Sequence, residues 1–220
     1  MSDLKTQARN FSEEKTKKNF SKVVWIYDFW SNLTEKKALS EALVLANITP
    51  GETILDVATG TGQMLKEIVK RNPSGHNSGI DLSPDMLEKA KVRLSEFDSD
   101  HYYLNVGNAY QLPFEDASFD LLFNNYMLDM LPEKDFSLIF DEFYRVLKSG
   151  GRVVITSMSL GKKWYNRFWY YIAKWFPELM TYCRPVPLTD HLVKSRFKII
   201  KSKQVSQNTF PSIVVLAVKI

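Results

Sequence analysis

Cysteine is nearly absent from this chain of 220 residues, which contains one, Cys183. A single thiol cannot form an internal disulfide, so the sequence favours a reducing compartment. The N-terminus lacks the apolar segment of a secretory signal, and no uncharged run approaches the roughly 20 residues of a membrane-spanning helix. These absences predict a cytoplasmic protein.

A strong excess of one charge is also missing. Lys and Arg number 29 against 25 Asp and Glu, and a net charge of +4 does not by itself indicate a nucleic-acid partner. The length suits one well-buried core with a small lid. Apolar residues recur helically from Phe20, and a further helix is expected from about 35 to 48. We therefore expect an N-terminal helical cap over residues 1–49 and a main domain over 50–220.

Residues 51–158 alternate between strand and helix patterns, which predicts a parallel sheet covered on both faces. Two further alternating runs, near 198–204 and 212–219, are expected to close the sheet as an antiparallel pair. The other strands are expected near 53–57, 76–81, 101–106, 119–125 and 151–158, and the helices near 62–72, 84–97 and 134–147. Ligands of such folds bind at the carboxyl ends of the strands.

The stretch Thr53–Leu65, TILDVATGTGQML, joins a short apolar strand to a helix through Gly60 and Gly62. Strand, glycine turn and helix open a βαβ nucleotide-binding unit, in which N–H groups at the helix N-terminus face the ligand. A second acid, Asp81, ends the next apolar run, nineteen residues after Gly62 (81 − 62). An acid at this position is placed to accept hydrogen bonds from both hydroxyls of a ribose.

The turn departs from the common nucleotide fingerprints. Leu65 occupies the position of the third glycine in a dinucleotide site, and no Gly-Lys-Ser/Thr follows, which excludes a P-loop. Asp56 lies in the strand just before the turn, where it is unfavourable beside a pyrophosphate and suits a cation with an amino-acid tail. An NAD- or NADP-dependent oxidoreductase stays as an alternative suggested by the generic fold.

The patterns D-x-A-T-G-T-G and G-I-D-L-S-P-D-M-L resemble the class I S-adenosylmethionine (SAM)-dependent methyltransferases, most of all the branch of ubiquinone and menaquinone biosynthesis. The resemblance covers roughly residues 20–160 and is specific in these two motifs. It implies a Rossmann-like α/β fold with a seven-stranded, mostly parallel sheet in the order 3-2-1-4-5-7-6 and helices on both faces. It also implies SAM as the cofactor, and no metal. The implied cofactor-binding residues are Asp56, Ala58, Gly60, Gly62, Asp81, Leu82, Met86, Asn108, Ala109, Asn124 and Asn125.

Two motifs at strand ends refine what the resemblance implies. Gly107–Phe114, GNAYQLPF, resembles G-D-A-x-x-L-P-F, whose acid accepts from the amine of adenine. Here Asn108 occupies the position of that acid. Its amide oxygen can accept the same hydrogen bond without charge assistance, so adenine binding is expected to be weaker. The loop Asn124–Tyr126 lacks the proline of methyltransferases that act on DNA or amines, so no DNA partner is expected.

From Leu160 the composition becomes aromatic and basic, which indicates an acceptor-side insertion at about 160–195. Between 160 and 203, ten Lys or Arg stand against two acids. The segment has three functional interpretations: a roof over an apolar acceptor pocket, contact with an anionic membrane, or stacking on nucleic-acid bases. The roof is favoured because the resembled enzymes build their acceptor site here, and membrane contact is compatible with it. An ordinary insertion with buried aromatics stays open. Eight aromatic residues crowd the segment: Trp164, Tyr165, Phe168, Trp169, Tyr170, Tyr171, Trp175 and Phe176.

The resulting hypothesis is SAM-dependent methyl transfer to a small, largely apolar acceptor, by in-line displacement in a dry aromatic pocket. The acceptor is a quinone precursor, a lipid or another small molecule. A non-catalytic SAM- or RNA-binding protein is a further alternative. Residues expected to contact the acceptor are Tyr27, Tyr126, Trp164, Phe168 and Arg184. Unranked candidates for removing an acceptor proton are Tyr27, Asp129 and His191.

Overall fold

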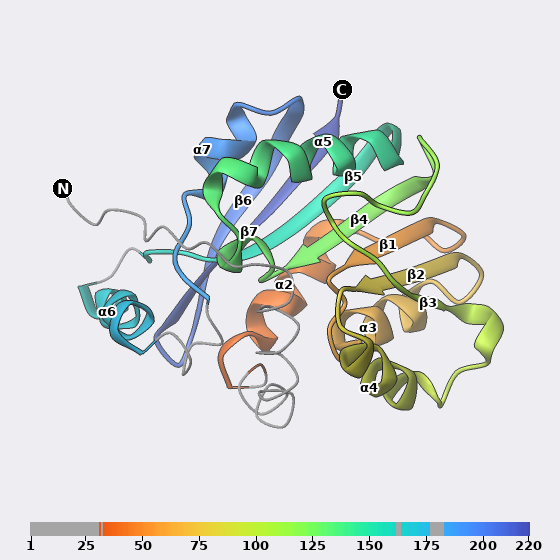
Figure 1. Cartoon of the computed structure of the whole chain (residues 1–220), viewed down its shortest axis with the longest axis horizontal. Coiled ribbons are helices and arrows are strands. Elements are labelled where there is room, and N and C mark those ends of the chain that lie inside the picture. Colours follow the sequence, from red (N-terminus) through yellow and green to blue (C-terminus); the bar gives the residue numbers. More distant parts are fainter. Residues whose placement is uncertain (1–30, 32, 162–163, 177–182) are drawn as a thin grey trace.

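The computed structural model describes residues 31, 33–161, 164–176 and 183–220. Its strands form one seven-stranded sheet in the order β3-β2-β1-β4-β5-β7-β6 (Figure 1). Strands β1 to β5 pair in parallel, and β7 runs antiparallel to β5 and β6. The predicted fold class and strand order are confirmed. The strands are β1 Thr53–Val57, β2 His76–Asp81, β3 Tyr103–Val106, β4 Phe119–Asn125, β5 Leu147–Met158, β6 Phe197–Gln207 and β7 Phe210–Lys219.

Helices cover both faces of the sheet (Figure 1). Helices α5 and α7 share one buried cluster with one face of the strands, while α2, α3 and α6 contribute to a cluster on the other face. Helix α4 packs beside α3 through a smaller cluster that includes Leu65 and Leu94. The helices are α2 Lys36–Ala46, α3 Gln63–Arg71, α4 Pro84–Leu94, α5 Phe136–Val146, α6 Arg167–Trp175 and α7 Leu188–Val193, with 3₁₀ turns η1 Ser99–His101, η2 Leu128–Met130, η3 Glu133–Asp135 and η4 Trp164–Asn166.

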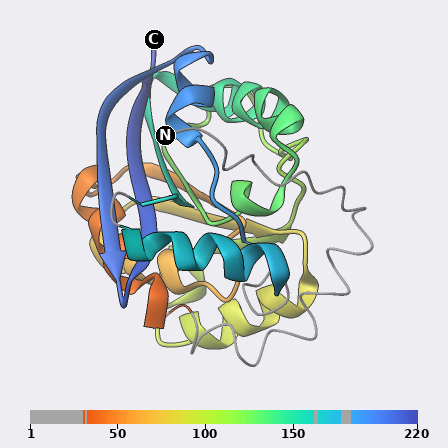
Figure 2. The ribbon, with the colours of Figure 1, turned by 90° about the vertical axis from the view of Figure 1, so that its left-hand side faces the viewer.

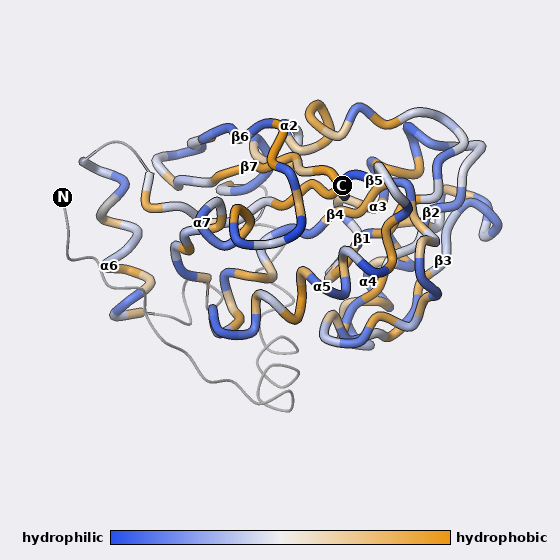
Figure 3. The backbone as a smooth tube through the Cα atoms, turned by 90° about the horizontal axis from the view of Figure 1, so that it is seen from above, coloured by the Kyte–Doolittle hydropathy of each residue, from blue (hydrophilic) through white to orange (hydrophobic). Residues whose placement is uncertain are grey.

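The central strands are apolar on both faces because helices lie on both sides of them. In β1, Ile54 belongs to the α2–α3 cluster, whereas Leu55 and Val57 belong to the α5–α7 cluster. Figure 3 shows the hydrophobic segments running along β7 and the neighbouring strands. Since the core secures these strands, their carboxyl ends form a firm edge on which a site can be built.

Two connections differ from the expected ones. Strand β5 begins at Leu147 instead of 151, because Gly150 adopts a φ of +73° and the register with β4 shifts between Phe119 and Leu121. The residues between the predicted helix end at 147 and the predicted strand start at 151 are therefore an irregular part of the strand. Strands β6 and β7 extend until two residues join them, Asn208 and Thr209, at φ values of 47° and 67°. Residues of this left-handed conformation close two-residue hairpins, so the connection is shorter than the one left between the predicted strands, which were expected to end near 204 and begin near 212.

Helix α2 is the described part of the predicted N-terminal cap. It packs on β5, β6 and β7 through Ala38, Ala42 and Ala46, which are at most 1% exposed. The helix predicted from Phe20 lies outside the described residues, and so does Tyr27. None of the helices described is long and apolar enough to cross a membrane.

Candidate cofactor and acceptor site

The turn after β1 leaves open space beside its first glycine. Ala58, Gly60 and Gly62 have φ values of 58°, 56° and 77°, so the chain bends through the left-handed region three times. A Cβ built on Gly60 would meet no atom within 4 Å, whereas one on Gly62 would lie 2.9 Å from the Cβ of Ala90 on α4. Gly60 thus borders space that a ligand can enter, and Gly62 lets α3 and α4 pack closely.

Asp81 ends β2 directly opposite this turn. Its Oδ2 accepts a hydrogen bond from the Gly60 N–H at 2.9 Å, and its Oδ1 accepts one from the Ser83 N–H at 2.8 Å. Burial raises the pKa of Asp81, and these backbone bonds partly offset that effect. The two sequence motifs therefore meet in space, with a carboxylate against the glycine turn.

Asp56 brings a second acid to the same turn. Its side chain is 1% exposed and accepts a 2.6 Å hydrogen bond from the Thr59 hydroxyl. Burial raises the pKa of Asp56 to about 7, the Thr59 bond lowers it, and the nearby charge of Asp81 raises it further. A cation placed beside two such carboxylates would stabilise their ionised forms.

The ends of β3 and β4 complete this edge. The Asn108 Oδ1 accepts from the Tyr110 N–H at 3.0 Å, so this side chain holds its own loop. The Asn124 Nδ2 donates to the Val57 carbonyl at 3.0 Å and ties β4 to the end of β1. Its Oδ1, and both side-chain polar atoms of Asn125, are buried without a partner among the described residues. Buried polar groups are normally paired, so these atoms indicate a bound ligand or water at the end of β4.

The remaining predicted cofactor residues lie around the same edge. Leu82 follows Asp81, and Met86 lies in the first turn of α4 with 2% of its side chain exposed. Ala109 follows Asn108 and is 8% exposed. The predicted cofactor residues thus occupy the turn after β1, the first turn of α4 and the ends of β2, β3 and β4.

Tyr126 and Asp129 lie just past β4 in a buried region. Tyr126 has a φ of 53°, which is strained for a bulky residue, and its hydroxyl bonds to the Ser212 Oγ at 2.7 Å. Asp129 is fully buried and accepts hydrogen bonds from the Ser157 hydroxyl and from the Met158 N–H, the latter at 2.6 Å. Burial raises the pKa of Asp129 to about 7 although these bonds lower it. Both oxygens already hold β5, so Asp129 has a structural role in this arrangement.

Glu35 is a second acid that interacts with this region, and the sequence did not indicate it. It precedes α2, is 2% exposed, and interacts electrostatically with Asp129 and Tyr126. Burial raises the pKa of Glu35 to about 7, a bond from the Ser31 hydroxyl lowers it, and the charge of Asp129 raises it. An acid at a helix start is usually an exposed, favourable residue, so no local pattern marks this one as buried.

The Ser31 hydroxyl connects Glu35 to the glycine turn. This hydroxyl also donates to the Oε1 of Gln63, the first residue of α3, at 2.9 Å. It has one proton, so it donates to either Gln63 or the Glu35 carboxylate at a given moment. The protonation state of Glu35 is therefore coupled to a side chain that adjoins the turn.

Arg184 and His191 are both held by one acid, Glu133. The Arg184 guanidinium is 1% exposed, and it donates to the Glu133 Oε1 at 3.0 Å and to the Leu131 carbonyl at 2.7 Å. The His191 Nε2 lies 3.0 Å from the Glu133 Oε2, and its ring packs edge-on against Phe136. These contacts hold the segment before β6 against the loop after β4, so both residues have a structural role.

Trp164 and Phe168 do not face the sheet. They are 84% and 62% exposed, whereas Tyr170 and Ala173 of the same helical stretch are 7% and 0% exposed. The sequence predicted that Trp164 and Phe168 line a pocket, but helical spacing places them on the outer face. The composition had indicated an aromatic helix without determining which side of it packs on the protein.

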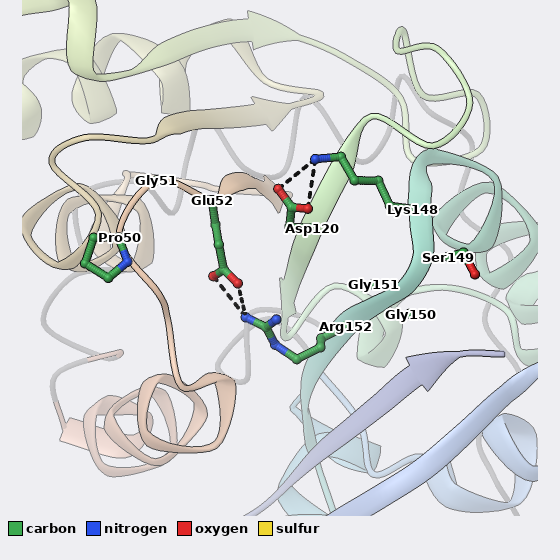
Figure 4. Close-up of a pocket in the computed structure, with 9 residues that line it drawn as sticks. All are labelled: Pro50, Gly51, Glu52, Asp120, Lys148, Ser149, Gly150, Gly151 and Arg152. Carbon is green, nitrogen blue, oxygen red and sulfur yellow. Dashed lines mark hydrogen bonds and ion pairs between the residues drawn. The ribbon is translucent and has the colours of Figure 1, made fainter.

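A depression of about 410 Å³ lies at the opposite edge of the sheet (Figure 4). It adjoins the amino ends of β1 and β4 and the start of β5. Glu52 pairs with Arg152 at 2.8 Å, and Asp120 pairs with Lys148 at 2.8 Å. Because its four charged side chains are paired with each other, this depression stabilises the strand starts and is distant from the chemistry.

The carboxyl edge of the sheet has the geometry of a nucleoside-binding site, and comparison with known proteins identifies the class of the protein. The chain belongs to the methyltransferase family: residues 48–210 match the methyltransferase domain. It is a SAM-dependent methyltransferase, and S-adenosylmethionine is its cofactor. This finding decides against the oxidoreductase and the non-catalytic alternatives.

Two relatives and one solved structure show which members of this family the chain is similar to. It is 32% identical over 177 residues to the demethylmenaquinone methyltransferase of Listeria monocytogenes serotype 4a (strain HCC23), covering 74% of this chain and 73% of the relative. It is 34% identical over 114 residues to the arsenite methyltransferase of Halobacterium salinarum, covering 51% of this chain but 29% of that relative. A chain in the complex of the Haloferax volcanii Trm112 methyltransferase activator with a methyltransferase shares the fold, with a TM-score of 0.74 and 17% identity over 93% of this chain and 97% of that one.

Proposed function

We propose that this methyltransferase acts on a small, largely apolar organic acceptor of the quinone-precursor or lipid type. The observation that carries the proposal is a buried group of three side chains that interact electrostatically: Tyr126 and Asp129, just past β4, and Glu35, which Ser31 links to Gln63 at the start of α3. Its carboxyls have raised pKa values, which suits removal of a proton from carbon or a phenol. The likeness to the demethylmenaquinone methyltransferase, which covers most of both chains, favours the same acceptor class.

The residues at the strand ends fit SAM. Gly60 borders open space, and Asn125 has buried polar atoms without partners among the described residues. Each Asp81 oxygen accepts one backbone N–H and has a further lone pair for a ribose hydroxyl. Asp81 would bind the ribose hydroxyls, the turn would bind the amino-acid part beside Asp56, and Asn108 would accept from the adenine amine. Bound SAM supplies a methyl group on a sulfonium, and transfer disperses its positive charge, so a dry surrounding favours the reaction.

Among the candidate proton acceptors, Glu35 suits the role best. A carboxyl with a pKa of about 7 is partly ionised at neutral pH and still basic enough to take a proton. Asp129 has the same raised pKa, but Ser157 and Met158 already donate to its oxygens. His191 is held by Glu133. Glu35 would therefore accept the acceptor's proton, and the Tyr126 hydroxyl, kept protonated by burial, would orient the acceptor.

Incubation with methyl-labelled SAM tests the proposal. Three acceptors are compared by mass spectrometry: a prenylated naphthoquinol, the same naphthoquinol without its prenyl chain, and arsenite. We expect label in the prenylated quinol, and a fall of about 100-fold in kcat for Glu35→Gln, since a general base contributes at least that much. Glu88→Gln, on the exposed surface of α4, is the control and keeps full activity. Labelling of arsenite alone, or an unchanged kcat in Glu35→Gln, contradicts the proposal.

A further inference from the structure

A row of aromatic side chains faces solvent along η4 and α6. Trp164, Phe168, Tyr171 and Trp175 follow one another at intervals of four, three and four residues, which places them on one helical face. They are 84%, 62%, 37% and 66% exposed. Phe176, at the end of the helix, is 61% exposed. We call these five side chains the aromatic face.

The opposite side of α6 is anchored to the sheet. The Trp169 Nε1 donates to the Thr209 Oγ1 at 3.0 Å, and the Trp169 ring lies edge-on to Phe210, with centroids 5.4 Å apart. The Asn166 amide donates to the Thr209 carbonyl at 2.7 Å. Figure 2 shows α6 lying across the surface in front of the sheet. The anchored side therefore determines which side chains point outward, and the exposure of the aromatic face follows from these contacts.

The charge of this segment has one sign. Residues 160–177 include Lys162, Lys163, Arg167 and Lys174 and contain no Asp or Glu. Lys174 is exposed beside Trp175 on α6. A segment whose sequence combines several indole and phenyl rings with cations, of which Lys174 is described as exposed, is complementary to a partner that is both apolar and anionic.

We propose that the aromatic face docks in the headgroup region of an anionic lipid surface. Trp and Tyr prefer this region because their rings are apolar while their N–H and O–H groups remain hydrated. The basic side chains add attraction to anionic headgroups. The inference is independent of which acceptor the enzyme methylates.

Two other occupants fit less well. A second copy of the chain, joined through the same face, would bring two segments of purely positive charge together. Single-stranded nucleic acid is bound in a basic groove with rings that accept stacked bases. Here the rings lie on the exposed face of α6, and the rings of Tyr171 and Trp175 already pack on each other with centroids 5.6 Å apart.

Flotation with lipid vesicles tests the docking. The full-length protein is mixed with vesicles of equal parts phosphatidylcholine and phosphatidylglycerol, or of phosphatidylcholine alone. We expect binding to the anionic vesicles, a loss of at least about 10-fold in W164S/F168S/W175S, and a loss of about fivefold in Lys174→Gln. The control V44S/V92S/L138S removes three other exposed apolar side chains, which are 69%, 75% and 56% exposed, and keeps wild-type binding.

Circular dichroism and SAM calorimetry establish that each variant is folded. Absence of wild-type binding to the anionic vesicles overturns the inference, and so does equal binding by W164S/F168S/W175S. Binding to single-stranded RNA without binding to vesicles assigns the face to nucleic acid instead. A dimer that W164S/F168S/W175S abolishes, in the absence of vesicle binding, assigns the face to self-association.

Discussion

Glu35→Gln should change how stability depends on pH. The pKa of Glu35 is about 7 in the folded protein against 4.5 for the free side chain, mainly because of burial. Between these two values the folded protein retains a proton that the unfolded chain releases, so stability falls as pH rises through this window and levels off above it. The difference of 2.5 units (7 − 4.5) corresponds to about 3 kcal/mol.

Urea unfolding of the wild type and Glu35→Gln from about pH 4.5 to pH 8 measures this effect, because a neutral amide does not titrate. We expect the stability of the variant relative to wild type to increase by about 3 kcal/mol across the window. Part of this gain comes through Asp129, which Glu35 repels. Glu88→Gln, whose side chain is exposed, should follow the wild-type curve.

Parallel curves for wild type and Glu35→Gln would refute the reasoning, since they would show that Glu35 titrates alike in both states. The pH dependence of kcat provides a second measurement. If Glu35 takes the acceptor's proton, kcat of the wild type should rise as pH passes about 7, and the variant should lose this dependence.

Three further predictions concern the cofactor turn and the surrounding structure. Asp81→Ala should weaken SAM binding at least about 100-fold in calorimetry, because two charge-assisted hydrogen bonds to the ribose are lost. Asp85→Ala, at an exposed position of α4, is the control, and equal SAM affinities of wild type and Asp81→Ala would contradict the site. Gly62→Ala should cost about 2 to 4 kcal/mol in urea unfolding, because its methyl group would lie 2.9 Å from a Cβ of α4 at a positive φ; an unchanged midpoint would argue against this packing. Glu133→Ala should cost about 3 kcal/mol because it leaves the 1%-exposed Arg184 without its carboxylate, and a loss below about 0.5 kcal/mol would show that the pair is not structural.

Local patterns were sufficient for the parts of the site that neighbouring residues build. The run from Thr53 to Leu65 specifies strand, turn and helix within thirteen residues, and its glycines supply the left-handed bends. Asp81 could be placed because parallel strands end at one edge of the sheet. The hairpin length could not be predicted in this way, because the sequence does not reveal that Asn208 and Thr209 both adopt a positive φ.

The sequence by itself determined the fold class, the strand order through the family resemblance, and the cofactor turn, since these follow from periodicity and motifs of short range. Tertiary structure alone decided that Glu35 is buried, that Asp129 is fastened to Ser157, and that Trp164 faces outward. The physical reason is that burial and charge depend on contacts between distant segments, such as the 28 residues separating Asp129 from Ser157. Such contacts exist only after the helices have packed on the sheet.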